Sequence, residues 1–591
     1  MVRKFSPVWA TLVLSALVLL LSSSLTAADS AVVDDRQEPA PTLVPPTLVP
    51  TVAPASSDAL PSESGIARIL RNGKVRVGIL YNEPPFGQFS IRGEESGFDA
   101  DLARALAEAW GTQVEFVQVT RQTGIDMVAA GEIDLLIAAQ PHLRELDERV
   151  EFSQSYYPSV EAMIVRQGDG ATVLGHMEGR KVGVVIGTNG ERAVDYWKSR
   201  ATYPFEVLRF LTLDLAIGAL NNSEIDGVVG NRVRLARVIH AEQQRFVDVP
   251  IMPEPYAIAM SRQDVNLRNL VNKTLQFLFV SGKLNEIHQR NFENATYPGN
   301  GFAVWSNVGD AAPKPDQFGQ DVPFPAQYAV PRMQAERTLR VAGLVDLPDD
   351  APESQRRLDA VNRALVNAMA ERWQVTVVPV ADGQNPIDLV ASGAADLAVG
   401  VQPDWNAINS VDFTSTYLMH GFRLMVRTAD DFSGFGDLRG KYIGVFQDDA
   451  GAREAVEALA ESANAVIDDF YAILREQDAA FTMQVENNAD VVFGDSLKLI
   501  PNVEAYPEEL ELTTNDDGTG IWYSRQFIGM AVPRNDINMR LLVEYTLQEL
   551  TRDGTLTSIL QPVMSAPDIP VLDIWPGSSY FLDFNLTGNV G

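Results

Sequence analysis

The side chains that most often carry out catalysis or hold metal ions are scarce and scattered in this 591-residue sequence. It contains no cysteine, which excludes disulfides, thiolate metal sites, thiol nucleophiles and a cysteine-linked lipid anchor. The histidines occur singly, so a zinc cluster or a histidine-based catalytic centre is poorly supplied. The five histidines are His142, His176, His240, His288 and His420.

Sequence motifs of the common enzyme classes are missing as well. The chain has no GxSxG elbow, no GxGxxG loop after a strand, no HExxH and no phosphate-binding loop. Neighbouring carboxylates such as Asp349-Asp350 and Asp516-Asp517 lie in segments typical of turns. We therefore expect a protein that is not an enzyme, with no catalytic residues, no metal site and no cofactor.

The composition narrows the classes of partner. Lys and Arg number 47 against 78 Asp and Glu, a net charge of −31 that repels a phosphate backbone and argues against nucleic-acid binding. The apolar fraction of 46% and the aromatic fraction of 8% are typical of globular proteins. The length predicts about four compact units.

The N-terminal segment has the pattern of an export signal. Arg3 and Lys4 precede an apolar stretch that ends in small residues near Ala28, which predicts a secretory signal peptide. The alternative is an uncleaved anchor that tethers the protein to a membrane, since about 18 apolar residues can just cross a bilayer. Both interpretations place the rest of the chain outside the cytoplasm, in the periplasm or at the cell surface, either secreted or membrane-anchored.

Two long segments repeat one plan, with an offset near 262 residues. The sequence AAGEIDL, which starts at Ala129, matches ASGAADL, which starts at Ala391. VEFSQSY, from Val150, matches VDFTSTY, from Val411. We call the two segments copy one and copy two. The expected domains are a signal peptide or anchor (1–28), a proline-rich linker (29–64), copy one (65–294), a second linker (295–335), copy two (336–565) and a C-terminal tail (566–591).

Strands and helices alternate along copy one. Residues 75–79 alternate apolar and other side chains as a strand does, and residues 98–110 carry apolar side chains at helical spacing. Residues 114–119 and 133–138 are predicted strands, with a short helix over 125–130 between them. This alternation indicates βαβ units and mostly parallel sheets. We predict an α/β fold of two tandem bilobal clamps, with a switched strand order in every lobe.

Copy one resembles the extracytoplasmic solute-binding proteins of the polar amino-acid uptake family, bacterial solute-binding protein family 3. The resemblance covers about residues 66–294, and its segments keep the family's order. They are Pro85-Phe86, Gly97-Phe98-Asp99, the GEIDLLIAA strand, EFSQSYY, GRKVGVVIGTNG and Glu224–Asn231. The resemblance implies a periplasmic-binding-protein-like (type II) clamp with a two-strand hinge. The expected crossings lie near residues 162–165 and 258–260.

The family's binding residues are only partly present in copy one. The carboxylate-binding arginine aligns with Leu146, so Arg144 is the nearest substitute, with a solvated helix charge as the alternative reading. The acid that binds the ligand's ammonium aligns with the neutral Asn231, and the aromatic stacker aligns with Glu83. The candidate ligand-binding residues are Tyr81, Glu83, Phe86, Ala139, Gln140, Arg144, Gly187, Thr188 and Asn231. This assignment predicts that Arg144→Ala weakens carboxylate binding and that Arg149→Ala does not.

Copy two resembles the family more weakly and lacks the GFD segment. Leu358-Asp359-Ala360 stands where that helix is expected to begin, and Asp448 and Asp449 occupy the turn where an anion would dock. The candidate residues of a second site are Asp404, Trp405 and Asp495. They would suit a cation, but degeneration to a structural domain is the preferred interpretation.

The resemblance implies an extracytoplasmic binding protein that captures a small polar solute, such as an amino acid, for the permease of an ABC transporter. The alternative is an extracellular sensory or interaction module that keeps the clamp fold without transport.

Overall fold

The computed structural model describes residues 63–577, apart from a few positions. The positions left out are 201–203, 294, 300–301, 326, 381–382, 431, 433, 464, 467–468 and 571. The expected export segment and nearly all of the proline-rich linker therefore lie outside the described residues. The described residues belong to one compact unit, so the domain boundaries within it stay predictions.

One nine-stranded sheet runs through both lobes of copy one. We call the lobe that holds β1 the core lobe and the other the distal lobe. In each lobe the first strand lies between the next two, as the switched order predicts. The strand order is β5 (Gln113–Gln118), β1 (Lys74–Ile79), β6 (Leu135–Leu136), β12 (Met252–Ser261), β7 (Val150–Arg166), β10 (Gly227–Asn231), β8 (Lys181–Val185) and β9 (Glu206–Phe210), with β11 (Gln244–Phe246) beside β7.

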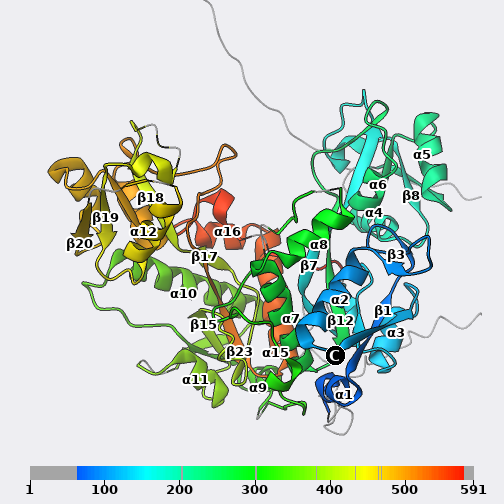
Figure 1. The fold of residues 1–591 in the computed structure, drawn as a ribbon, viewed down its shortest axis with the longest axis horizontal. Helices are drawn as coiled ribbons and strands as arrows, with labels where there is room; N and C mark the ends of the chain where they lie inside the picture. The colour runs from blue at the N-terminus through cyan, green and yellow to red at the C-terminus, as the bar shows by residue number, and fades with distance from the viewer. Residues whose placement is uncertain are drawn as a thin grey trace, which may run out of the picture. The chain divides into compact units, whose positions relative to one another are not determined.

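Successive side chains of the core-lobe strands enter two separate hydrophobic clusters, because alternate residues of a strand face opposite sides of a sheet. Leu135 and Ile258 pack with α2 (Phe98–Trp110), whereas Leu136 and Ala257 pack with α3 (Gly124–Ala129). The two helices thus lie on opposite faces of this sheet (Figure 1). The other helices of the core lobe are α1 (Gly65–Asn72), α7 (Val265–Val280) and α8 (Lys283–Asn291), and β2 (Asn82–Glu83), β3 (Gly87–Phe89) and β4 (Glu95–Ser96) form a small three-stranded sheet.

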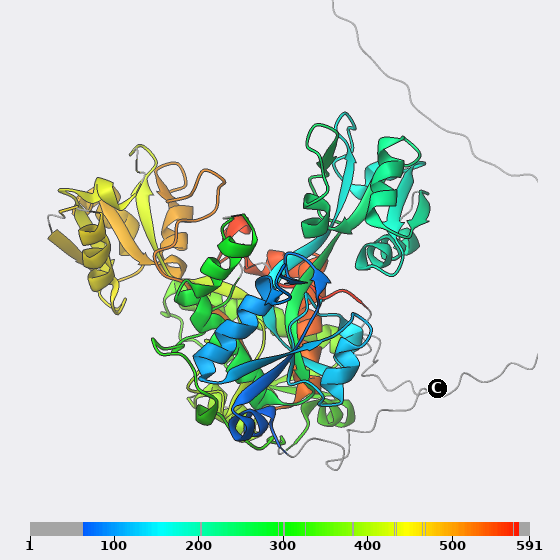
Figure 2. The same ribbon diagram turned by 45° about the vertical axis from the view of Figure 1, so that its right-hand side comes forward.

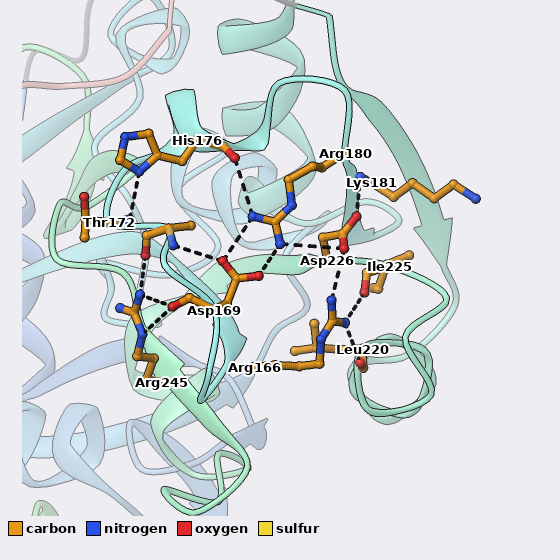
Figure 3. Close-up of polar contacts among 11 residues, drawn as sticks. Arg166, Asp169, Thr172, His176, Arg180, Lys181, Leu220, Ile225, Asp226 and Arg245 are labelled. Atoms are coloured by element: carbon orange, nitrogen blue, oxygen red, sulfur yellow. Dashed lines mark hydrogen bonds and ion pairs between the residues drawn. The ribbon is translucent and has the colours of Figure 1, made fainter.

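Arginine–aspartate pairs join the loops of the distal lobe (Figure 3). Arg180 contacts Asp169 and lies 3.6 Å from Asp226, which also accepts a hydrogen bond of 3.0 Å from Arg166. The hydrogen bond from Arg180 lowers the pKa of the Asp169 carboxyl. These pairs link the end of β7 to the segments before β8 and β10. The distal-lobe helices are α4 (Asn189–Arg200), α5 (Leu213–Asn221) and α6 (Arg232–Ala236).

Strands β7 and β12 connect the two lobes, as the two-strand hinge predicts (Figure 2). The expected crossing points are shifted, however. Residues 162–165 already pair with β10 in the distal lobe, and Ala259 and Met260 pair with β6 in the core lobe. The pairing of β12 with β7 is irregular between Tyr256 and Ala259, so the crossing lies there and at the facing part of β7.

Copy two builds the same plan on two separate sheets. Its core-lobe order is β14 (Thr376–Pro379), β13 (Thr338–Ala342), β15 (Leu397–Val401), β23 (Gln526–Pro533) and β16 (Val411–Phe413), with β17 (Leu418–His420) beside β23. Its distal-lobe order is β20 (Asp469–Ile473), β19 (Tyr442–Phe446), β21 (Val491–Asp495), β18 (Phe422–Arg427) and β22 (Leu510–Leu512). Its helices are α9 (Ala329–Glu336), α10 (Glu353–Trp373), α11 (Pro386–Ala391), α12 (Ala452–Ser462), α13 (Asp478–Phe481), α14 (Ser496–Ala505), α15 (Ile537–Arg552) and α16 (Thr555–Leu560).

Matching buried contacts support the repeat. Trp110 donates a hydrogen bond of 2.9 Å to Thr274 in copy one, and Trp373 donates one of 2.9 Å to Thr546 in copy two. Each tryptophan ends the long helix that follows the first strand of its copy.

These contacts correct the expected start of that helix in copy two. Tyr156 donates to Asp99 in copy one, and its counterpart Tyr417 donates to Asn362, so Asn362 takes the place of Asp99. Helix α10 begins at Glu353, directly after Pro352 and well before Leu358. Its added first turn contacts the distal lobe, where Ser354 bonds to Glu476.

A buried ion network joins the core lobes of the two copies. Arg268 on α7 contacts Glu151 of its own copy at 3.1 Å and Asp412 of copy two at 2.9 Å. Arg540 on α15, the counterpart of Arg268, contacts the same Glu151. Burial alone would lower the pKa of the Arg268 guanidinium, but Asp412 and Glu151 raise it. Each arginine thus reaches an acid of the opposite copy.

Candidate functional site

A cleft of about 470 Å³ lies between the lobes of copy one. Its walls come from the core lobe, the start of α4, the end of β10 with α6, and the two crossing strands. A larger cavity of about 590 Å³ lies where the two copies meet. We build the candidate site on the cleft because several charged side chains converge there from both lobes.

Two arginines in the cleft share one buried acid. Glu83 on β2 is 6% exposed and accepts a hydrogen bond of 2.8 Å from Arg121. It also contacts the Nε and Nη2 atoms of Arg234 on α6. Since Glu83 belongs to the core lobe and Arg234 to the distal lobe, this ion pair bridges the cleft. Arg192 and Glu145 form a second bridge at 2.8 Å.

Two buried acids lie side by side on the crossing strands. Glu161 and Glu254 are 2% and 3% exposed, and both line the cleft. In the pairing of β7 with β12, Ser159 lies opposite Glu254 and Met252 opposite Glu161, so the two acids share one face of the sheet. Asn231 lies opposite Glu161 on β10, and its amide is 2.7 Å from the Glu254 carboxylate. The neutral residue at position 231 is thus in contact with a buried acid on β12.

Asp99 is buried beside the cleft and fixes the backbone that leads to Gln140. Its carboxylate accepts hydrogen bonds from the Ala139 amide at 2.7 Å and from the Tyr156 hydroxyl at 2.8 Å. Burial raises the pKa of Asp99 to about 7. Ala139 has a φ of 43°, which is costly for a residue with a side chain, so the hydrogen bond that its amide donates to Asp99 helps hold that conformation. The next residue, Gln140, lines the cleft and bonds to Pro141.

The carboxylate of Glu191 already binds the turn before α4, where a ligand carboxylate is expected. Gly187, with a φ of 74°, donates its amide to the Glu191 carboxylate at 2.8 Å. This bond lowers the pKa of Glu191. Thr188 donates its hydroxyl to Val185 and accepts from the Glu191 amide at 3.4 Å, which is a weak helix cap. Both residues line the cleft, and a ligand carboxylate here would have to share the turn with Glu191.

The remaining apolar candidates of copy one do not line this cleft. Phe86 is 2% exposed and packs edge-on against Tyr157 and Tyr256 in the core. Tyr81 packs on Phe89, with ring centres 3.9 Å apart, and lines an adjoining cavity that shares Arg121 and Arg234 with the cleft. Ala139 contributes its backbone amide, which donates a hydrogen bond to Asp99.

The structure does not place Arg144 in the cleft. Its side chain is 2% exposed and faces copy two, where it donates to Gln548 at 2.8 Å and to Glu549 at 3.0 Å. The guanidinium also lies 4.9 Å from the ring centre of Tyr545. The structure therefore does not support the ligand role expected for Arg144, because its side chain is used in the contact between the copies. Arg149, the intended control, lines the cleft instead.

This placement reverses the expected behaviour of Arg144. Arg144→Ala should leave the affinity of copy one for its ligand within about twofold of wild type, and lower the unfolding free energy by about 1.5–3 kcal/mol, the value of hydrogen bonds to a charged group. Titration calorimetry and urea denaturation of the variant measure the two effects. A tenfold loss of affinity with unchanged stability would return Arg144 to the binding site.

The candidate residues for a second site in copy two do not converge on one cleft, because each has partners elsewhere in the structure. Trp405 is 3% exposed, packs on Trp305 at 4.5 Å and donates to Gln276 of copy one at 2.8 Å. Asp404 accepts from Asn307 at 2.9 Å in the linker. Both therefore belong to the junction of the copies, which contradicts their expected role.

Polar contacts also occupy the expected binding positions inside copy two. Asp495 caps α14 through the Leu497 amide and pairs with His420 at 2.7 Å. The acids of the expected anion turn, Asp448 and Asp449, both pair with Lys498. These internal pairs agree with the interpretation that copy two is structural.

Four residues of the site were not selected from the sequence: Arg121, Arg234, Glu161 and Glu254. Glu161 and Glu254 carried a usable signal, since each is a lone acid within an otherwise uncharged strand segment, VEAMIV and MPEPYAIAM. A charge inside a strand that crosses between lobes is costly unless it has a partner or a function. Arg121 and Arg234 lie in loop and helix segments that carry no such signal.

Comparison with known proteins agrees with the fold. The profile of bacterial extracellular solute-binding proteins, family 3, matches residues 75–294. A second profile, described as NMT1/THI5 like, matches residues 372–509 within copy two. This second match fits a divergent solute-binding copy.

The individual relatives that match copy one are named for binding amino acids. The ABC transporter glutamine-binding protein GlnH of Bacillus subtilis is 26% identical, over 38% of this chain and 83% of its own. The L-arginine-binding protein of Pseudomonas aeruginosa is 25% identical, over 38% of this chain and 90% of its own. A solved structure, an ancestral arginine-binding protein bound to arginine, is 30% identical with a TM-score of 0.32, and the match covers 37% of this chain and 98% of that one.

Proposed function

Because the chain belongs, through residues 75–294, to the bacterial extracellular solute-binding proteins of family 3, we propose that copy one captures a small polar solute for an ABC transporter. The solute is an amino acid or a related compound. The observation that carries this proposal is the cleft itself, where guanidinium groups and buried carboxyl groups converge from both lobes. The permease that receives the solute is the proposed partner.

The cleft suits a zwitterion. Arg121 and Arg234 provide guanidinium groups that bind a carboxylate in a planar, forked geometry. Glu161 and Glu254 provide the opposite charge on the crossing strands. Glu83 holds the two arginines in place between the lobes. A bound solute would therefore contact both lobes and favour their approach.

We place the protein outside the cytoplasm, secreted or tethered through residues 1–28. The family name supports an extracellular location, and the apolar N-terminal stretch supports export. Within the part of the chain that the structure describes, no helix has both the length and the apolar character that a bilayer crossing requires. N-terminal sequencing of the mature protein distinguishes a cleaved signal from an anchor.

Arg121→Ala should weaken binding of an amino acid by more than about tenfold, because a charge-assisted hydrogen bond contributes about 1.5–3 kcal/mol. The experiment titrates the full chain with the twenty standard amino acids in a calorimeter and repeats the tightest binder with the variant. Arg71→Ala is the matched control, since Arg71 is exposed and its ion pair is with Glu63, away from the cleft. Failure of every amino acid to bind would exclude this function in favour of a sensory or interaction module without transport.

A further inference from the structure

We propose that Glu161 and Glu254 form the subsite for a cationic nitrogen group of the solute, and that binding of this group displaces a proton from the acid pair. This inference rests on the proposed function of the cleft and specifies how its ligand is recognised.

One carboxylate oxygen of Glu161 has no hydrogen-bond partner among the residues that the structure describes. No donor among the described residues bonds to its Oε2 atom, which is buried. This atom lies at the start of α4, where a Cβ placed on Gly190 would come within 3.0 Å of it. Burying a carboxylate oxygen without a donor is costly, so this atom is available to a donor group of the solute.

Glu254 has the donors that Glu161 lacks. Its two carboxylate oxygens accept from the side-chain amides of Asn189 on α4 and Asn231 on β10. Glu161 lies beside it, and two carboxyl groups bond to each other only if one carries a proton. Burial raises the pKa of Glu161 well above its usual range, and the charge of Glu254 raises it further. The empty pair therefore holds one proton between two acids.

A cationic nitrogen group can replace that proton. An ammonium group carries several donors and a positive charge, so it can bond to the free oxygen of Glu161 and to Glu254 together. The ionised pair then has a counter-charge, and the proton leaves to solvent. One N–H···O contact to each acid forms, and one O–H bond to the shared proton is lost.

The nearby arginines do not form an ion pair with Glu161. Arg121 and Arg234 act on Glu161 through space and favour its ionised form, but both are bonded to Glu83. Burial also raises the pKa of Tyr256 well above its usual range, so this group does not titrate near neutrality. The groups around the pair are Ser159 on β7, Asn189 on α4, Asn231 and Arg234 at β10 and α6, Glu254 and Tyr256 on β12, Arg121 after β5 and Glu83 on β2.

The sign of the pH dependence follows from this exchange. Free protein holds a proton that bound protein has lost, so raising the pH favours the bound state. The affinity should rise with pH by up to about tenfold per unit while the free pair is protonated, and should level off above that range.

The test uses L-arginine, L-histidine and L-glutamine as probes of the full chain. Calorimetry of the tightest binder at pH 6, 7 and 8, in phosphate and in MOPS, counts the protons released from the buffer dependence of the enthalpy. We expect release of close to one proton at pH 6 and an affinity that rises with pH. Glu161→Gln should abolish the release and weaken binding by at least about tenfold. Glu206→Gln, at an exposed position of the same lobe, is the matched control.

The outcomes separate the two proposals. Binding without proton release, with equal affinities for wild type and Glu161→Gln, overturns the acid-pair subsite and leaves the proposed function standing. No binding of any probe or other amino acid overturns both. The proton count on the wild-type protein decides the inference even if the variant does not fold.

Discussion

Replacing Arg268 with alanine should lower the free energy of unfolding by about 3–5 kcal/mol. Arg268 is buried and contacts Glu151 of its own copy and Asp412 of copy two. Its removal leaves two buried acids with less counter-charge, and the cost of an uncompensated buried charge exceeds that of the lost contact itself. Urea denaturation followed by circular dichroism measures the change.

The matched control for this variant is Arg290→Ala. Arg290 also pairs with an aspartate, Asp101, but its side chain is 58% exposed. An exposed pair contributes about 0–1 kcal/mol, so the control should unfold almost like wild type. Equal stability of the two variants would show that the ion network does not hold the copies together.

Glu83→Ala should weaken ligand binding by about a hundredfold, equivalent to about 3 kcal/mol. Glu83 contacts Arg234 across the cleft, and this pair can form only when the lobes lie close together. Losing it shifts the clamp towards open forms that bind the solute poorly. The two arginines released from Glu83 would attract a carboxylate more strongly. Because they are partly exposed to solvent, this gain is about 1 kcal/mol, which is smaller than the loss.

Calorimetry with the tightest-binding amino acid measures this effect, and small-angle X-ray scattering of the variant reports whether the clamp opens. Glu286→Ala, an exposed acid that pairs with Lys283, serves as the control. An unchanged affinity for Glu83→Ala would mean that the bridge across the cleft does not contribute to capture.

The periodicity of the sequence predicts the fold of copy one well. The alternation at residues 75–79 and the helical spacing over 98–110 correspond to β1 and α2. The strand expected over 133–138 is shorter, since only Leu135 and Leu136 pair with β1. Pairing depends on the partner strand, which periodicity does not contain.

The candidate site was less predictable because its charged groups come from distant segments. Glu161 and Glu254 meet only through the register of β7 with β12, so no local spacing connects them. Arg144 has the residue type and approximate position of a carboxylate ligand, but copy two covers it. Trp405 was misassigned for the same reason, since its partner Gln276 belongs to copy one. Contacts between two copies of a fold leave no signature in the sequence of either one.

The ion network has a consequence for assembly. Arg268 and Arg540 each contact an acid of the other copy, yet both belong to one polypeptide. A dimer held by the same contacts would separate on dilution, whereas the linker over residues 295–335 keeps the partner at a local concentration that dilution does not change. A symmetric homodimer also carries every substitution twice. A fused pair is free of this constraint. Copy two can therefore extend α10 and place Asp448 and Asp449 in its anion turn, while copy one keeps its cleft.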